Sequence, residues 1–219
     1  MPRLDVVLWD WNGTLLDDVD VCIRCLNRLL ADHGYPQQYD LPQYREIFGF
    51  PIIDYYRRAG FDLARHPFPL LAERYMKLYL PAAEHCGLVP GARRTLEWFA
   101  ANGVPQVILS ASPLDTLQRQ VAAQGLSGFF SELLGLGDIY AKSKVQLGLD
   151  WLQRAHIDPA RALMLGDSTH DAEVAAALGV RCILTAAGHE SRARLVAAGC
   201  PVADTPGQVP ALAAGLFGL

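Results

Sequence analysis

Three kinds of pattern are missing from this sequence, and each absence excludes a class of protein. No apolar run approaches the roughly 18 residues that a membrane-spanning helix needs, so we expect a soluble cytoplasmic protein without a membrane partner. The formal net charge is −4 and basic residues form no patch, which argues against nucleic acid as the main partner. No internal repeat or low-complexity linker occurs. A small molecule is the expected partner.

Cysteine is scarce and shows no paired spacing of the zinc-binding kind. The five cysteines are Cys22, Cys25, Cys86, Cys182 and Cys200. Cys22 and Cys25 have the spacing of a redox pair, but they lie inside a helical pattern instead of opening a helix after a strand. We therefore expect buried free thiols.

Short apolar runs alternate with helical patterns along most of the chain. Hydrophobic residues make up 51% of the 219 residues, enough for a large α/β domain or a domain carrying an insert. Strands buried on both faces are predicted at residues 4–9, 104–109, 162–165 and 180–185. Helices are predicted at residues 92–101, 113–124, 144–155, 171–178 and 191–198. This alternation predicts an α/β fold with a doubly wound parallel sheet, a Rossmann-like core.

The stretch from residue 16 to residue 88 differs, because it contains helical patterns and no convincing strand. One apolar stripe precedes a stop at Gly34, and a second follows a proline-rich loop. The stripes are Val19, Cys22, Leu26, Leu29 and Leu30, and then Leu70, Leu71, Tyr75, Leu78 and Tyr79. Pro42 and Pro51 suit helix starts. We predict an α-helical cap at 16–88, inserted into a core formed by 1–15 and 89–219.

Polar residues follow the predicted strands where each strand ends. In a doubly wound sheet the carboxyl ends of the strands face a common crevice. Those ends supply Asp10, Ser110 and Asp167, with Asp171 one helical turn further on and Lys144 at a helix start. Carboxylates hold hard cations through oxygen, while a hydroxyl and an ammonium group bind an anion. The sequence therefore predicts a site for a metal ion and an anionic substrate.

Four segments, in chain order, resemble the motifs of the haloacid dehalogenase-like superfamily. They are residues 6–15 (VVLWDWNGTL), residues 107–110 (VILS), Lys144, and residues 165–171 (LGDSTHD). The helical insert after the first motif, and the return to the core at Val89-Pro90-Gly91, look like the phosphoglycolate phosphatase-like branch with its helical cap.

The resemblance implies a Mg²⁺-dependent phosphatase for a small phosphorylated metabolite. Asp10 would form an aspartyl-phosphate. Mg²⁺ would be held by Asp10, Asp167 and the backbone carbonyl of Asn12. Lys144 and Ser110 would stabilise phosphate oxygens, and Asp171 would orient bound water or Lys144. The expected substrate contacts are Gly13, Thr14, Ser110, Ala111, Lys144 and Arg45. The protein would be a monomer or a homodimer.

The sequence departs from the family pattern at Asn12, where phosphatases of the family have a second aspartate. An amide cannot act as general acid or base, a role worth about a hundredfold to ten-thousandfold in rate. Asn12 remains in the predicted catalytic set, and we expect a slow phosphatase. The alternatives are recruitment of another acid such as His170, a phosphate-ester-binding or regulatory protein, and a phosphonate or carbon–halogen hydrolase.

Several assignments have competitors. Ser112 rivals Ser110, although it also suits a helix N-cap before Pro113. Lys142 rivals Lys144, because some branches of the family place the lysine slightly earlier. Arg45, Tyr56, Arg57 and Arg58 are candidates to meet a second anionic group of the substrate, and a solvated helix face explains them equally well.

Overall fold

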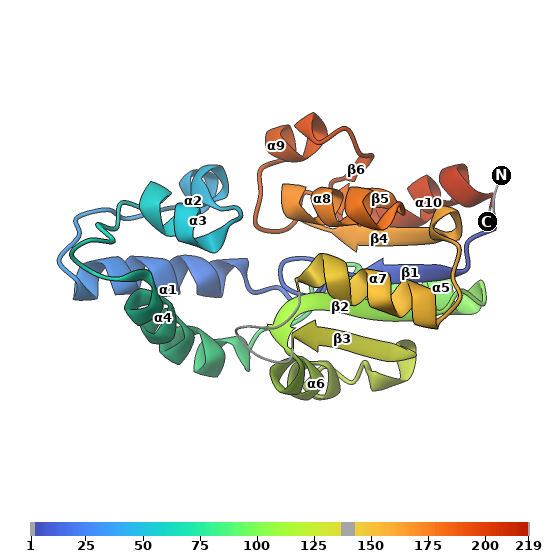
Figure 1. The fold of residues 1–219 in the computed structure, drawn as a ribbon, viewed down its shortest axis with the longest axis horizontal. Coiled ribbons are helices and arrows are strands. Elements are labelled where there is room, and N and C mark those ends of the chain that lie inside the picture. Colours follow the sequence, from blue (N-terminus) through green and yellow to red (C-terminus); the bar gives the residue numbers. More distant parts are fainter. Residues whose placement is uncertain (1–2, 137–142, 219) are drawn as a thin grey trace.

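A six-stranded parallel sheet forms the centre of the protein in the computed structural model, which describes residues 3–136 and 143–218 (Figure 1). The strands lie in the order β3-β2-β1-β4-β5-β6, and every neighbouring pair is parallel. Their bounds are β1 Val6–Trp9, β2 Gln106–Pro113, β3 Glu132–Leu136, β4 Ala162–Gly166, β5 Arg181–Thr185 and β6 Val202–Ala203. The predicted α/β fold class is confirmed.

Two of the six strands were not predicted from the sequence. β3 and β6 are the edge strands, so each is paired on one side only. β3 is mostly half-buried, and β6 has only two residues. For these reasons neither strand forms a long apolar run in the sequence. β2 also runs further than predicted, to Pro113, with a shift of its register to β3 between Leu109 and Pro113. Ser110 thus lies inside this irregular strand, not just beyond it.

Helices cover both faces of the sheet. On one face lie α5 (Ala92–Ala101), α6 (Leu114–Ala123) and α10 (Val209–Phe217), and on the other lie α7 (Lys144–Arg154), α8 (Thr169–Leu178) and α9 (Arg192–Ala197). Short 3-10 helices occur at η1 (Ser127–Phe129), η2 (Pro159–Arg161) and η3 (Pro206–Gln208). A hydrophobic core lies on each face of the sheet, and successive residues of β1 alternate between them. Val7 and Trp9 pack into one core, and Val6 and Leu8 pack into the other. This explains why β1 reads as a continuous apolar run.

Polar partners fix the two tryptophans of the first motif inside the core. The Trp9 indole nitrogen donates to the side-chain oxygen of Gln106 at 2.9 Å. The Trp11 indole nitrogen donates to the side-chain oxygen of Gln120 at 2.8 Å. Both rings are fully buried, and a buried indole N–H needs an acceptor. These bonds hold the backbone on either side of Asp10.

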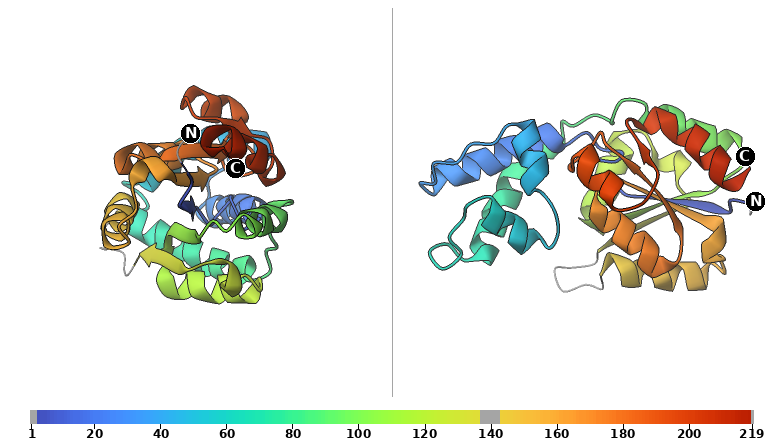
Figure 2. Two further views of the ribbon diagram at one scale, coloured as in Figure 1. Left: turned by 90° about the vertical axis from the view of Figure 1, so that its right-hand side faces the viewer. Right: turned by 90° about the horizontal axis from the view of Figure 1, so that it is seen from above.

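Four helices form a lobe beyond the carboxyl ends of the strands, seen at the left of Figure 1 and of the right-hand view in Figure 2. They are α1 (Val19–Asp32), α2 (Leu41–Ile47), α3 (Ile52–Arg58) and α4 (Phe68–Ala83). Pro42 lies in the first turn of α2 and Pro51 directly precedes α3, as predicted. The exact division into core and cap, at residues 15 and 89, stays a prediction.

The apolar stripes of the lobe pack largely as predicted. All five stripe residues of α1 are buried. In α4, Leu71 and Tyr79 are buried, but the prediction for Leu70 is wrong, because its side chain lies near the helix start on the solvent side and is 38% exposed. All five cysteines are free, four of them buried and Cys200 half-buried. Among the described residues, no helix is long and apolar enough to cross a membrane.

Candidate active site

Asp10 lies at the centre of the site because β1 ends one residue before it, between β2 and β4. Its backbone N–H donates to the carbonyl of Leu165 at 2.8 Å, so the strand pairing fixes its position. Its side chain is nearly buried, with one oxygen accepting from Lys144 at 2.6 Å and the other from the Thr14 hydroxyl at 3.3 Å. Burial raises the pKa of Asp10 to about 6, even though Lys144 opposes the shift.

Lys144 joins two carboxylates at the start of α7. The Ser143 hydroxyl accepts from the N–H of Gln146 and thereby caps this helix. The buried ammonium group of Lys144 donates to Asp10 at 2.6 Å and to Asp171 at 2.7 Å. Burial alone would favour the neutral amine, but the two carboxylates outweigh it and raise the pKa of Lys144 above its usual value. Its rival Lys142 lies outside the described residues.

Asp167 follows β4 and is almost completely buried beside Asp10. One oxygen accepts from the Thr14 hydroxyl at 3.0 Å and the other from the backbone N–H of His189 at 2.6 Å. Burial raises the pKa of Asp167 to about 7, and the carboxylate of Asp10 adds to the shift. Thr14 therefore lies between the two carboxylates that the sequence predicts as metal ligands.

Asp171 supports the site from the first turn of α8. One of its oxygens accepts from Lys144, and the other accepts from the hydroxyl of Ser168 at 2.7 Å and its N–H at 3.1 Å. Burial opposes ionisation of Asp171, but Lys144 and these hydrogen bonds outweigh it and lower its pKa. Both oxygens are thus used within the protein, which fits a positioning role.

The chemistry of the donors fits a hard divalent cation. Carboxylate oxygens of Asp10, Asp167 and Asp171 lie within 4.8 Å of one another in a buried setting. The raised pKa values of Asp10 and Asp167 come mainly from burial, and neighbouring carboxylates add to them. Lys144 supplies one positive charge against these three acids, which is an imbalance of charge. A cation bound to oxygen ligands would correct it.

The amide of Asn12 is held on three sides. Its nitrogen donates to Asp18 at 2.9 Å and to the hydroxyl of Tyr79 at 2.7 Å, and its oxygen accepts from Ser112 at 2.8 Å. Ser112 thus binds Asn12, whereas Ser110 is buried and lines the same pocket as Asp10. The amide cannot rotate without breaking these contacts.

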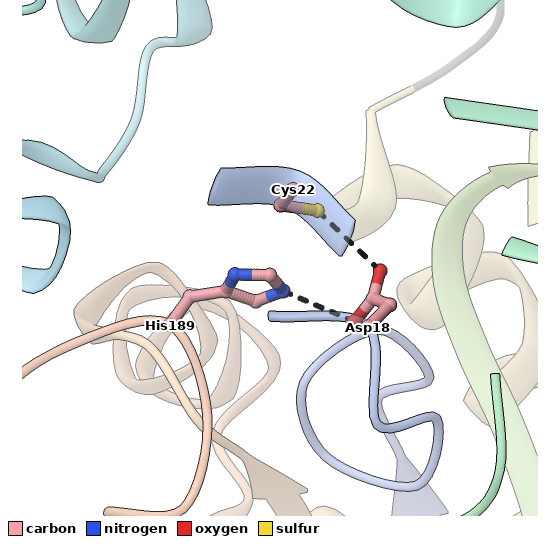
Figure 3. A group of neighbouring side chains, drawn as sticks. All are labelled: Asp18, Cys22 and His189. Atoms are coloured by element: carbon pink, nitrogen blue, oxygen red, sulfur yellow. Dashed lines mark hydrogen bonds and ion pairs between the residues drawn. The ribbon is translucent and has the colours of Figure 1, made fainter. Parts of the chain in front are cut away.

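Three residues of this network were not found by sequence reasoning: Asp18, Tyr79 and His189. Asp18 accepts from the Gly13 N–H at 2.9 Å and from the Tyr79 hydroxyl at 2.6 Å. A ring nitrogen of His189 lies 3.3 Å from Asp18, and Cys22 flanks the same carboxylate (Figure 3). Burial disfavours the imidazolium, but Asp18 outweighs it and raises the pKa of His189 to about 9. The rule of strand ends, extended to the loop after β5, would have pointed to His189.

The lobe is closed onto the core by contacts to the loop that follows β5. The Tyr44 hydroxyl lies 2.9 Å from a ring nitrogen of His189, and Phe48 stacks on the same ring with centroids 4.7 Å apart. The guanidinium of Arg45 donates to the carbonyls of Gly188 and Ala187, each at 2.9 Å. Arg45 was predicted to contact substrate, and the structure shows it joining the lobe to the core.

The other predicted residues of the lobe are distributed differently. Arg57 pairs with Asp54 on the surface, and Arg58 donates to the carbonyl of Ile47. Tyr56, in contrast, is buried and lines a cavity of the lobe. His170 lies at the pocket mouth, where its ring stacks on Phe50 with centroids 4.3 Å apart.

A pocket of about 430 Å³ brings most of these side chains together, part of it open to solvent. The predicted residues that line it are Asp10, Asn12, Ser110, Ala111, Lys144, Asp167, His170 and Asp171. Gly13 and Thr14 do not line it; Gly13 donates to Asp18, and the Thr14 hydroxyl lies between the two carboxylates of Asp10 and Asp167. The geometry therefore brings together a buried carboxylate, a buried ammonium group and a cluster of carboxylate oxygens in one place.

Known proteins share both this sequence pattern and this fold. Residues 7–185 match the family model described as haloacid dehalogenase-like hydrolase. A phosphoglycolate phosphatase of Pseudomonas putida is 29% identical, covering 84% of this chain and 69% of that protein. One from Synechococcus elongatus is 27% identical over 93% of this chain and 94% of the relative. A structure of a haloacid dehalogenase-like family protein from Streptococcus pneumoniae superposes with a TM-score of 0.83, at 19% identity and 95% and 98% coverage.

Proposed function

Since the chain belongs to the haloacid dehalogenase-like hydrolase family, we propose that it hydrolyses a small phosphate monoester through an aspartyl-phosphate on Asp10. The observation that carries the proposal is the contact of Asp10 with buried Lys144, within 4.8 Å of the Asp167 and Asp171 carboxylates. Relatives named phosphoglycolate phosphatase support the reaction class.

Each side chain of the pocket has its own proposed role in phosphoryl transfer. Asp10 attacks phosphorus with one carboxylate oxygen, which splits one difficult displacement into two easier ones. Lys144 neutralises charge on the phosphate oxygens, and the Ser110 hydroxyl donates to one of them. Asp171 positions Lys144 through the bond of 2.7 Å. Water then attacks the aspartyl-phosphate and regenerates Asp10.

The proposed cofactor is Mg²⁺, held by Asp10, Asp167 and the backbone carbonyl of Asn12. When bound, it supplies positive charge that stabilises the phosphate oxygens during transfer. Thr14 keeps the two carboxylates in place, because its hydroxyl lies 3.3 Å from Asp10 and 3.0 Å from Asp167. The His189 N–H orients the far oxygen of Asp167.

Proton transfer to the leaving oxygen is the step of the proposed reaction that Asn12 cannot catalyse. Asn12 occupies the place of the acid in the family pattern and can donate only a hydrogen bond. Without a proton donor the leaving oxygen departs with its negative charge, so esters of basic alcohols react slowly. A second candidate is a phosphate-ester-binding protein without turnover, which the firmly held amide of Asn12 favours.

Acetyl phosphate tests the proposal, because its leaving group needs no protonation. We expect the wild-type protein with Mg²⁺ to release phosphate and to carry one phosphoryl group on the peptide containing Asp10 in quenched samples. Asp10→Asn and chelation of Mg²⁺ should each abolish both signals. Asp115→Asn, at an exposed position of α6, serves as control. Binding of inorganic phosphate without turnover or phosphoenzyme would favour the binding-protein alternative.

A further inference from the structure

A second hollow opens from the catalytic pocket into the helical lobe. It spans about 910 Å³, a volume that includes space open to solvent, and we call it the cap cavity. Asn12, Phe48, Phe50, Ala111 and His189 line both the cap cavity and the catalytic pocket, so the two adjoin. A phosphate group bound beside Asp10 would therefore direct its organic part into the cap cavity.

The walls of the cap cavity are mainly aromatic. Its aromatic residues are Phe48, Phe50, Tyr55, Tyr56, Tyr75 and Tyr79. Ile52 and Met76 add aliphatic surface. Aromatic rings prefer offset or edge-to-face neighbours, and Tyr55 and Tyr56 already meet at 89°. Such a surface suits a planar apolar ring better than a hydrated polar group.

The cap cavity offers no free positive charge to a second anionic group. Among the described residues, its lining contains no lysine or arginine. Of the described residues that line the cavity, the charged pair is Asp18 and His189, whose facing atoms lie 3.3 Å apart, so the two neutralise each other (Figure 3). Arg45, which the sequence suggested as a partner for a second anionic group, instead donates its hydrogen bonds to backbone carbonyls. A carboxylate such as that of phosphoglycolate would lose its hydration there without gaining a partner.

The chemistry of Asn12 sets a second, independent condition on the organic group. Because the amide of Asn12 cannot supply a proton in place of the missing aspartate, a weakly basic leaving oxygen is favoured. A phenol ionises near pH 10, as tyrosine does, whereas an ordinary alcohol is far more basic. Building on the proposed function, we infer that the substrate is an aryl phosphate monoester whose ring lies in the cap cavity.

The reaction balances without a protein acid. An Asp10 oxygen forms a bond to phosphorus as the bond from phosphorus to the aryl oxygen breaks, and the phenolate leaves with that electron pair. Both N–H groups of Asn12 already donate to Asp18 and Tyr79, so solvent water protonates the departing oxygen. Attack by water on the aspartyl-phosphate yields inorganic phosphate and free Asp10.

Three phosphate esters and one acyl phosphate separate the elements of the inference when kcat/KM is measured with Mg²⁺. Phenyl phosphate has the ring and the good leaving group, benzyl phosphate has only the ring, and 2-phosphoglycolate has neither. We expect the order phenyl, benzyl, phosphoglycolate, with each step about tenfold or more. Acetyl phosphate reports the proposed function alone. Turnover of acetyl phosphate, with phosphoglycolate preferred over both ring esters, would overturn the inference, and no turnover of any of the four compounds would overturn both the inference and the proposed function.

A charge placed in the cap cavity tests where the ring binds. Met76 lines the cavity from α4, whereas Leu70 on the same helix is 38% exposed and does not line it. We expect Met76→Arg to shift the ratio of kcat/KM for phenyl phosphate over phosphoglycolate by about tenfold or more toward phosphoglycolate. Leu70→Arg should leave the ratio unchanged. An unchanged ratio in a Met76→Arg protein with a wild-type Tm would place the ring elsewhere and overturn the inference.

Discussion

The side-chain amide of Asn12 donates a hydrogen bond of 2.9 Å to the carboxylate of Asp18. Burial opposes ionisation of Asp18, but His189 and the surrounding donors outweigh it and lower its pKa. The position at which the family pattern led us to expect an acid is therefore tied here to a fixed negative charge. An amide suits that neighbour, because it is a donor and carries no charge of its own.

Asn12→Asp should increase turnover of alkyl phosphates by about ten- to a hundredfold. The introduced carboxyl would meet Asp18 at hydrogen-bond distance, and a neighbouring like charge raises a carboxyl pKa. The raised pKa keeps part of the new group protonated near neutrality, as a general acid must be. Steady-state rates with benzyl phosphate from pH 5 to pH 9 test this. Unchanged or lower turnover across that range would contradict it.

The same substitution should cost stability in a pH-dependent way. A carboxyl whose pKa is higher in the folded than in the unfolded chain stabilises the fold at low pH and loses that effect as pH rises through the folded value. Relative to wild type, the Tm of Asn12→Asp should therefore be lower at pH 8 than at pH 5. The double variant Asn12→Asp, Asp18→Asn, which removes the neighbouring charge, should lose most of this dependence.

Mg²⁺ should stabilise the protein more at pH 8 than at pH 5. The pKa values of Asp10 and Asp167 rise to about 6 and about 7, against about 3.9 in an unfolded chain. The metal-free fold thus holds extra protons, and its stability falls as pH rises from about 4 to about 7. Bound Mg²⁺ needs both groups ionised. At a concentration of 100 Kd the Tm should rise by about 5 to 10 °C at pH 8. Asp167→Asn should abolish the rise; an equal rise at both pH values would contradict this account.

Residues near strand ends were predictable because parallel topology brings those ends together. Asp10, Ser110, Asp167 and Lys144 do line one pocket, although their catalytic roles stay predictions. Sequence spacing gives no such guide for the cap. Asp18 lies at the start of a helix beside other acidic residues, a setting typical of a solvent-exposed charge at a helix end, yet its side chain is buried.

Contacts across long sequence separations explain what could not be predicted. The amide of Asn12 meets the hydroxyl of Tyr79, 67 positions away, and no local pattern encodes that meeting. Edge strands β3 and β6 are also weakly encoded, because each is paired on one side only and neither makes a long apolar run.

Gly188→Ala should weaken Mg²⁺ binding while the fold survives. A methyl group at Gly188 would come within 2.1 Å of a carboxylate oxygen of Asp167, so the carboxylate must move. Displacing a metal ligand through its neighbour costs about 10- to 100-fold in affinity. Titration calorimetry with Mg²⁺ measures the loss. Gly128→Ala, at a position with nothing within 4 Å, is the matched control and should bind as wild type does. Equal affinities in the two variants would argue that Asp167 is not a ligand.

Arg45→Ala separates a role in substrate binding from a role in closing the lobe. Its two bonds to the carbonyls of Gly188 and Ala187 hold the lobe against the loop that positions His189. Each charge-assisted bond contributes about 1.5 kcal/mol or more, and about 1.4 kcal/mol is a factor of ten, so the loss of both bonds should lower kcat/KM by about a hundredfold. Because closure serves every substrate, the loss should be the same for phenyl phosphate, acetyl phosphate and phosphoglycolate. Arg57→Ala, which removes a surface pair with Asp54 and a side chain 56% exposed, should change none of them. A loss confined to phosphoglycolate would instead show that Arg45 binds the second anionic group, as its position in the sequence first suggested.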